Sequence, residues 1–148
     1  MTKDVLISLK GLQFGSDLEN DRVELITSGS YYKKNNKHYI LYNEISEGFT
    51  EETKNLVKFE DKLFDLSKTG LTNVHMVFEE NKKNMTNYIT PYGSILIGID
   101  AKRVSVQETK ELISVNIDYA LEVNYEFLAD CKITMDIQSK DGADFSLH

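Results

Sequence analysis

The sequence is poor in the residues that covalent and metal chemistry require. Its 148 residues include one cysteine, Cys131, and three histidines, His38, His75 and His148. One thiol cannot make an internal disulfide bond or a cysteine-rich zinc site. The histidines lie on separate predicted elements without paired ligand spacing, and there is no glycine-rich phosphate loop. The sequence therefore predicts no metal site and no cofactor.

Positive charge and long apolar runs are also scarce. Acidic residues number 24 and basic residues 17, which gives a formal net charge of -7, so we expect no nucleic acid and no membrane as a partner. The stretch MTKDVLISLKGLQ carries Asp4, Ser8 and Lys10 where a signal peptide has an apolar run. The longest apolar runs are far below the ~20 residues of a membrane-spanning helix. We therefore expect a cytoplasmic protein.

Catalytic motifs are absent as well. Gly93-Ser94-Ile95 begins a predicted strand and lacks the strand–turn–helix context of a nucleophile elbow. Cys131 falls on an alternating apolar face, which is typical of a core thiol. Adjacent carboxylates occur in charge-rich turns, which is typical of solvated loops: Glu51–Glu52, Glu60–Asp61 and Glu79–Glu80. An enzyme is a third possibility, which would require His75, a carboxylate and a tyrosine to converge in one pocket.

What the chain does have is an alternation of apolar and polar residues. The two longest runs are 113–123 and 127–137, and both have their apolar residues at odd positions. Alternation of this length predicts strands with one buried face. We expect a three-residue loop, Asn124-Tyr125-Glu126, to keep both apolar sets on the same face. The predicted cross-strand pairs are Leu121–Ala129, Tyr119–Cys131, Ile117–Ile133 and Val115–Met135.

Shorter alternating segments recur along the rest of the chain. We expect strands at Val5–Leu9, Val23–Lys34, Lys37–Ile45, Leu56–Phe59, Leu63–Leu66, Val74–Phe78, Met85–Thr90 and Ser94–Val106. A total of about ten short strands predicts one all-β domain, residues 1–140, folded as an antiparallel barrel or sandwich. Helical patterns are limited to Glu108–Glu111, which follows a capping-box motif, and to Phe49–Lys54. We expect the tail, residues 141–148, to be disordered.

The stretch YYKKNNKHYILY, residues 31–42, sets a basic cluster between aromatic residues. Asparagine tolerates positive φ, so Asn35–Asn36 suits a two-residue hairpin turn, and adjacent tyrosines then point to opposite faces. A solvated hairpin tip accounts for every residue of the stretch, and an anion-binding patch is the alternative. The predicted pairs are Lys34–Lys37, Lys33–His38, Tyr32–Tyr39 and Tyr31–Ile40.

Two longer segments carry a family resemblance. They are SGSYYKKNNKHYILYNE, residues 28–44, and ITPYGSILIGI, residues 89–99, followed by a strand that ends IDYALEVN. With them the chain resembles the YwiB-like family of small bacterial proteins, a domain of unknown function, from about Val5 to Ile137. The resemblance implies a calycin-like (lipocalin-like) β-barrel of about eight to ten strands with at most short helical turns. It implies no established activity, so no catalytic residue is carried over.

Two functions remain open, because an antiparallel barrel can be packed solid or enclose a ligand cavity. In the first, the barrel binds a small apolar or amphipathic ligand, and its mouth is lined by Tyr42, Tyr88, Tyr92 and Tyr119. In the second, the protein is an interaction or structural module that uses an outer face or an edge strand to form a homodimer or meet another partner. The second is motivated by Tyr39–Tyr42 and Ser94–Ile97, which carry apolar residues on both strand faces.

Overall fold

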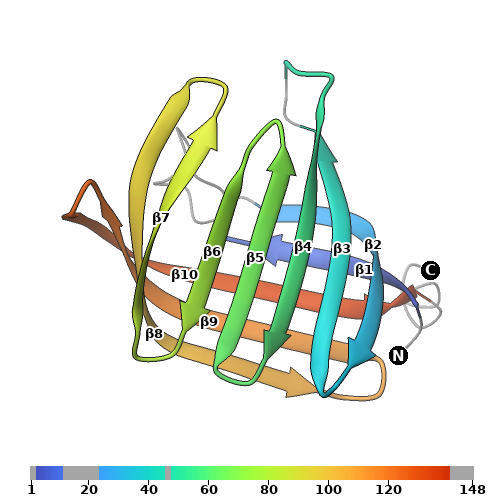
Figure 1. Ribbon diagram of the computed structural model, residues 1–148. Helices are drawn as coiled ribbons and strands as arrows, with labels where there is room; N and C mark the ends of the chain where they lie inside the picture. The colour runs from blue at the N-terminus through green and yellow to red at the C-terminus, as the bar shows by residue number, and fades with distance from the viewer. Residues whose placement is uncertain (1–2, 12–23, 46–47, 141–148) are drawn as a thin grey trace.

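One antiparallel sheet of ten strands accounts for the fold (Figure 1). The computed structural model describes residues 3–11, 24–45 and 48–140. Within these ranges the strands are β1 (Asp4–Lys10), β2 (Glu24–Lys34), β3 (Lys37–Ile45), β4 (Glu52–Glu60), β5 (Leu63–Gly70), β6 (Val74–Glu79), β7 (Lys83–Thr90), β8 (Gly93–Glu108), β9 (Leu112–Val123) and β10 (Glu126–Ser139). The prediction of an all-β barrel is confirmed, and several strands are longer than the sequence pattern predicted.

The strands follow one another around the barrel in chain order. Each strand pairs with the next from β1 to β6 and again from β7 to β10, and β10 returns to pair with β1. The remaining seam lies between β6 and β7. Two backbone hydrogen bonds of 2.9 Å join Asn73 and Ile89 across it, and the Asn84 side chain donates to the Val77 carbonyl at 3.3 Å. The barrel is therefore nearly closed.

Strand β2 turns a corner of the barrel. In Figure 1, strands β3–β7 and the first part of β8 run upright, whereas β1, β9, β10 and the rest of β8 cross behind β3–β6. Strand β2 pairs with β1 as far as Ser30 and with β3 from Ser30 to Lys34. Gly29 lies at this change of partner, where a Cβ atom would be 2.6 Å from Ile7 Cδ1 and 2.7 Å from the Leu41 carbonyl oxygen. A larger residue would therefore force β2 away from its neighbours.

Inward-facing side chains fill the middle of the barrel. Phe78 contacts Phe64 and Tyr119 edge-on, with ring centroids 5.8 and 5.1 Å away. Burial of a large apolar side chain stabilises a fold by roughly 1.5–3 kcal/mol, so this core supplies most of the stability of the barrel. The largest fully buried side chains are Phe59, Phe64, Phe78, Ile7, Ile40, Leu66, Met76, Ile97, Ile99, Ile113, Ile117 and Leu121.

The β2–β3 hairpin has the predicted turn and register. Asn35 and Asn36 both have positive φ, at 54° and 66°, as a two-residue primed turn requires. All four predicted pairs form, including Tyr32 opposite Tyr39, whose rings stack with centroids 4.7 Å apart. Tyr31 is buried and Tyr32 is exposed, which confirms that the adjacent tyrosines point to opposite faces.

The β9–β10 hairpin has the predicted register but a different loop. All four predicted pairs form, from Leu121–Ala129 to Val115–Met135. The expected three-residue loop is wrong, because the connection is a two-residue turn in which Asn124 and Tyr125 have φ of 52° and 71°. A β-bulge between Phe127 and Ala129 supplies the extra residue that returns the apolar sets to one face.

Both helical expectations are also wrong. Glu108 ends β8 and Leu112 begins β9, and the Thr109 amide closes the turn between them by donating to the Leu112 carbonyl at 2.8 Å. The Phe49–Lys54 segment is irregular up to Glu51 and then enters β4, because β3 and β5 both pair with it. The tail, residues 141–148, lies outside the described residues. Among the described residues no helix has the length and apolar character needed to cross a bilayer.

Candidate functional site

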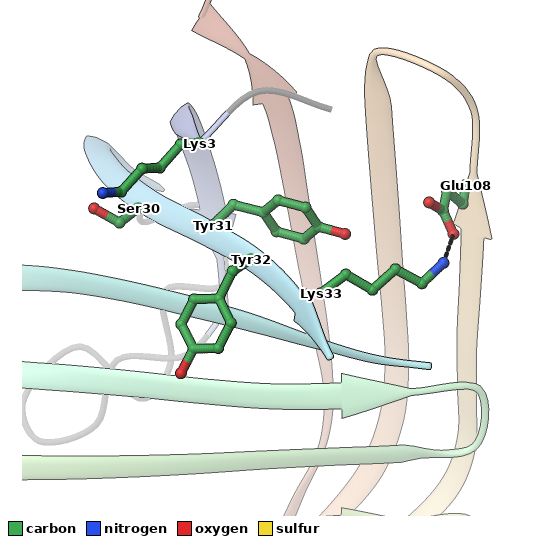
Figure 2. Close-up of a pocket in the computed structure, with 6 residues that line it drawn as sticks. All are labelled: Lys3, Ser30, Tyr31, Tyr32, Lys33 and Glu108. Carbon is green, nitrogen blue, oxygen red and sulfur yellow. Dashed lines mark ion pairs between the residues drawn. The ribbon is translucent and has the colours of Figure 1, made fainter. Parts of the chain in front are cut away.

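A pocket of about 440 Å³ opens at one end of the barrel, here termed the open end (Figure 2). The tip of the β2–β3 hairpin meets the carboxyl end of β8 there, at the lower right of Figure 1. The pairing of β1 with β2 stops at Asp4 and Ser30, whereas β2 continues to Lys34, and the pocket follows this overhang. It is lined by Lys3, Ser30, Tyr31, Tyr32, Lys33 and Glu108.

Alternation along β2 divides the lining of the pocket between two faces. In Figure 2 the Tyr31 phenol points toward the side where Lys33 meets Glu108, whereas the Tyr32 ring points away from it. The backbone amide of Tyr31 donates to the Lys3 carbonyl at 2.8 Å, which holds Lys3 at the edge of the pocket. The pocket therefore combines aromatic surface with hydroxyl, ammonium and carboxylate groups.

A tyrosine, a histidine and a carboxylate converge beside this pocket. Tyr31 Oη lies 2.7 Å from His38 Nδ1, and the other ring nitrogen, His38 Nε2, lies 3.6 Å from Glu108 Oε1. Lys33 Nζ lies 3.6 Å from the same carboxylate oxygen. His38 is only 5 % exposed, and its ring stacks on Phe59 with centroids 4.8 Å apart. The histidine is therefore held from two sides, while the carboxylate is held loosely.

Burial sets the protonation of these groups. Burial lowers the pKa of His38 from its ordinary value of 6.5, with Glu108 opposing this effect and Lys33 adding to it. His38 is therefore neutral at pH 7. Burial, and then the charge of Glu108, raise the pKa of Tyr31, which remains a phenol. A neutral imidazole in this position can accept a hydrogen bond on one nitrogen and donate one from the other.

The opposite end of the barrel, here termed the plugged end, carries a buried polar network. Lys68 Nζ on β5 donates to Glu44 Oε1 on β3 at 2.5 Å and to Asn55 Oδ1 on β4 at 2.8 Å. The Asn55 amide in turn donates to the same Glu44 oxygen at 3.1 Å. The side chains of Lys68 and Glu44 are 7 % and 20 % exposed. Three neighbouring strands are thus tied together by short contacts.

The four tyrosines predicted to line a mouth lie in different parts of the molecule. Tyr119 is in the core beside Phe78, and Tyr92 is 87 % exposed in the β7–β8 turn. Tyr42 and Tyr88 both lie at the plugged end, close enough to Glu44 for its negative charge to raise their pKa values. The lining of the 440 Å³ pocket includes none of the four.

Tyr42 and Tyr88 are shielded phenols. Burial, followed by the charge of Glu44, raises the pKa of Tyr88 to about 12, and the same causes raise the pKa of Tyr42 further. Within the described part of the chain, the buried Tyr42 hydroxyl has no hydrogen-bond partner. Leaving such a group unpaired costs about 1–3 kcal/mol, so this hydroxyl is a weak point of the plugged end.

The other chemically reactive groups lie apart from the pocket. His75 faces outward as predicted, and its Nε2 meets the Asp65 carboxylate oxygens at 2.9 and 3.0 Å. Cys131 lies opposite Tyr119 as predicted, but it is only half-buried, and burial raises the pKa of its thiol. His148 lies outside the described residues. Among residues 3–11, 24–45 and 48–140 no group of three His, Cys, Asp or Glu side chains could hold a metal ion.

The meeting of His38 and Glu108 was not predicted. His38 was assigned to the basic hairpin tip, although His38, Ile40 and Tyr42 alternate on one buried face of β3, and this alternation was the available signal. Glu108 was expected in a helical turn. No local pattern links it to His38, because only the closure of the barrel brings the end of β8 beside the β2–β3 hairpin.

The chain matches a known family over most of its length. Residues 7–135 match the domain of unknown function DUF1934. The chain belongs to this family. It is also similar to the crystal structure of the YwiB protein from Bacillus subtilis, with a TM-score of 0.74 and 18 % sequence identity over 93 % of this chain and 92 % of that chain.

The structural match and the family match together confirm the YwiB-like resemblance. At 18 % identity the structural similarity establishes the fold alone. A search of curated proteins gives no match. The family description assigns no activity, and a shared fold does not imply a shared function.

Proposed function

We propose that the protein binds a small amphipathic molecule at the open end of its barrel. The observation that carries this proposal is the pocket of about 440 Å³ at the overhang of β2. Ligand sites are typically concave, with apolar or aromatic walls and a few polar groups that fix orientation. Tyr31 and Tyr32 supply ring surface, and Ser30 supplies a hydroxyl. Lys3 and Lys33 supply charged donors.

The interior is a poorer candidate for the ligand. Side chains of the core fill the centre of the barrel, and the network around Lys68 occupies the plugged end. The proposal therefore puts the ligand at the rim, whereas the sequence hypothesis put it inside the barrel, with Tyr42, Tyr88, Tyr92 and Tyr119 at the mouth. A cytoplasmic location is part of the proposal, because the free thiol of Cys131 suits a reducing compartment.

A titration of ¹⁵N-labelled protein with octanol, a neutral amphipathic probe, tests the proposal. The amide signals of residues 30–33 are expected to shift and to saturate, and Tyr32→Ala is expected to weaken binding. Tyr125→Ala removes another exposed tyrosine, in the β9–β10 turn, and is expected to leave binding unchanged. Shifts that do not saturate, or that cluster around Asn55 and Lys68, would rule the proposal out.

A second candidate function is self-association through the outer face of β2–β4. Tyr32 and Leu41 are exposed there, Tyr32 stacks on Tyr39, and Leu41 lies opposite Leu56. Apolar side chains gathered on one outer face favour a contact between two copies of the chain.

Sedimentation velocity at micromolar concentration separates this candidate from the first. A dimer is expected for the unmodified protein, and Leu41→Lys is expected to dissociate it. Phe127→Lys changes an exposed apolar residue of the β9–β10 hairpin and serves as the control. A monomeric unmodified protein would eliminate this candidate and leave ligand binding untouched.

A further inference from the structure

Glu108 occupies a position between two nitrogen donors without a close contact to either. Its Oε1 atom lies 3.6 Å from Lys33 Nζ and 3.6 Å from His38 Nε2. Charge-assisted N–H···O contacts are typically about 2.7–2.9 Å long. The Lys68–Glu44 contact at the plugged end, at 2.5 Å, is much shorter. Glu108 therefore fills this position poorly.

The His38 ring, which supplies one of these two nitrogen donors, is fixed in orientation by its neighbours. Tyr31 Oη lies 2.7 Å from His38 Nδ1. If Nδ1 carried the proton, the Nε2 lone pair would face the Glu108 carboxylate, which is electrostatically unfavourable. Tyr31 therefore donates to Nδ1, and the proton on Nε2 points toward Glu108. The stacking of His38 on Phe59 keeps this direction fixed.

We propose that the ligand of this pocket carries a carboxylate, which replaces Glu108 between Lys33 and His38. The inference rests on the proposed function, because it specifies the ligand class of the same pocket. Lys3, at the other side of the pocket in Figure 2, adds a second positive charge to the lining. The apolar part of the ligand then lies along the overhang of β2, which carries Tyr31 and Tyr32.

The place of Glu108 in the fold allows this exchange. Glu108 is the last residue of β8, and its side chain is 41 % exposed. The turn that follows is closed by hydrogen bonds between Thr109 and Leu112, so the Glu108 side chain can rotate into solvent without disturbing it. A free carboxylate is not tethered to a strand and can approach Lys33 and His38 to hydrogen-bond distance.

A cationic ligand paired with Glu108 is the alternative, and the lining disfavours it. Two lysines and one glutamate line the pocket, so a cation would face a net positive charge. His38 is neutral and presents an N–H group, which an anion accepts and a cation does not. The two ligand classes predict opposite effects of removing the Glu108 charge.

Calorimetric titration of the full chain with octanoate and octanol distinguishes these possibilities. Glu108→Gln removes the competing carboxylate, so octanoate is expected to bind about tenfold more tightly than to the unmodified protein, with octanol affinity unchanged. Glu111→Gln removes the same charge from an exposed position in the adjacent turn and is expected to leave octanoate affinity unchanged. Lys33→Met is expected to weaken octanoate binding about tenfold, and Lys34→Met to have no effect.

Equal or weaker octanoate binding by Glu108→Gln would overturn the inference, because Glu108 would then be no competitor. If octanol still shifts the amides of residues 30–33 in that case, the proposed function stands without the carboxylate. If neither octanol nor octanoate shifts those amides in the unmodified protein, the proposed function fails as well.

Discussion

The two ends of the barrel each bring a lysine and a glutamate together, with different results. At the plugged end, Lys68 and Glu44 are largely buried, 2.5 Å apart, and share Asn55 as a third partner. At the open end, Lys33 and Glu108 are about half exposed and 3.6 Å apart. The chain thus uses the same pair of residue types in two settings.

The difference shows which end can exchange partners. A buried ion pair that loses one member leaves an uncompensated charge, so the network around Lys68 is costly to open. An exposed ion pair contributes little to stability, and water or another anion can replace either member. The plugged end is therefore part of the folded core, and the open end is available for a ligand.

The largest effect is expected from breaking the plugged end. Lys68→Met leaves Glu44 without its cation and should lower the free energy of unfolding by about 3–5 kcal/mol in urea denaturation. Lys58→Met, on the exposed face of β4, is the matched control and should change it by less than about 0.5 kcal/mol. A loss below about 1 kcal/mol for Lys68→Met would mean that the network is not a structural plug.

Substitutions in β9, in the barrel wall between the two ends, should lower the free energy of unfolding by an amount that depends on whether the residue faces inward or outward. Ile117→Ala opens a cavity in the core and should cost about 2–5 kcal/mol, whereas Asn116→Ala, on the outer face, should cost well under 1 kcal/mol. Chemical denaturation of both variants measures the difference. Similar losses for the two would contradict the inward orientation of Ile117.

A smaller effect on the free energy of unfolding is expected from removing the Lys33–Glu108 ion pair at the open end. Lys33→Met removes an exposed ion pair and should change the free energy of unfolding by about 0.5 kcal/mol or less, like Lys34→Met. Urea denaturation should therefore show a much smaller loss of stability for Lys33→Met than for Lys68→Met. A loss of several kcal/mol for Lys33→Met would make the two ends equivalent and would remove the argument for a replaceable carboxylate.

A further effect concerns pH. The pKa of folded His38 is lowered by burial, so the unfolded chain binds more protons below about pH 6.5 and stability falls as the pH falls. Tyr31, Glu108 and Lys33 face His38, and the loss should stay below about 1.4 kcal/mol per pH unit. Denaturation at pH 7.5 and 5.5 should show this loss in the unmodified protein and in His75→Gln, but less of it in His38→Phe. An unchanged loss in His38→Phe would contradict the assignment.

Local patterns in the sequence were sufficient for the strands and for much of their pairing. Asn35–Asn36 predicted the turn and register of β2–β3, and the odd-numbered alternation predicted the inner face of β9 and β10. The turn of the β9–β10 hairpin could not be predicted from the odd-numbered positions of the apolar residues alone. A three-residue loop and a two-residue turn followed by a bulge both satisfy the same alternation, and the chain uses the second.

The candidate site depended on information that no local pattern contains. The depth of a side chain along the barrel is set by strand tilt and stagger, so four tyrosines that looked equivalent in sequence divide between the core, a turn and the plugged end. His38 and Glu108 meet because the carboxyl end of β8 closes against the β2–β3 hairpin. The alternation of buried residues along β3 was sufficient to predict that His38 faces inward. It contains no information that Glu108 lies beside His38.

The most direct test of the contrast between the ends is a map of where octanoate perturbs the backbone amides of ¹⁵N-labelled protein. If the open end is the binding end, saturable shifts should appear at residues 30–33, at His38 and at Glu108, while Glu44, Asn55 and Lys68 remain unchanged. Shifts centred on Glu44, Asn55 and Lys68 with none at residues 30–33 would mean that the plugged end is the binding end, and would contradict the account.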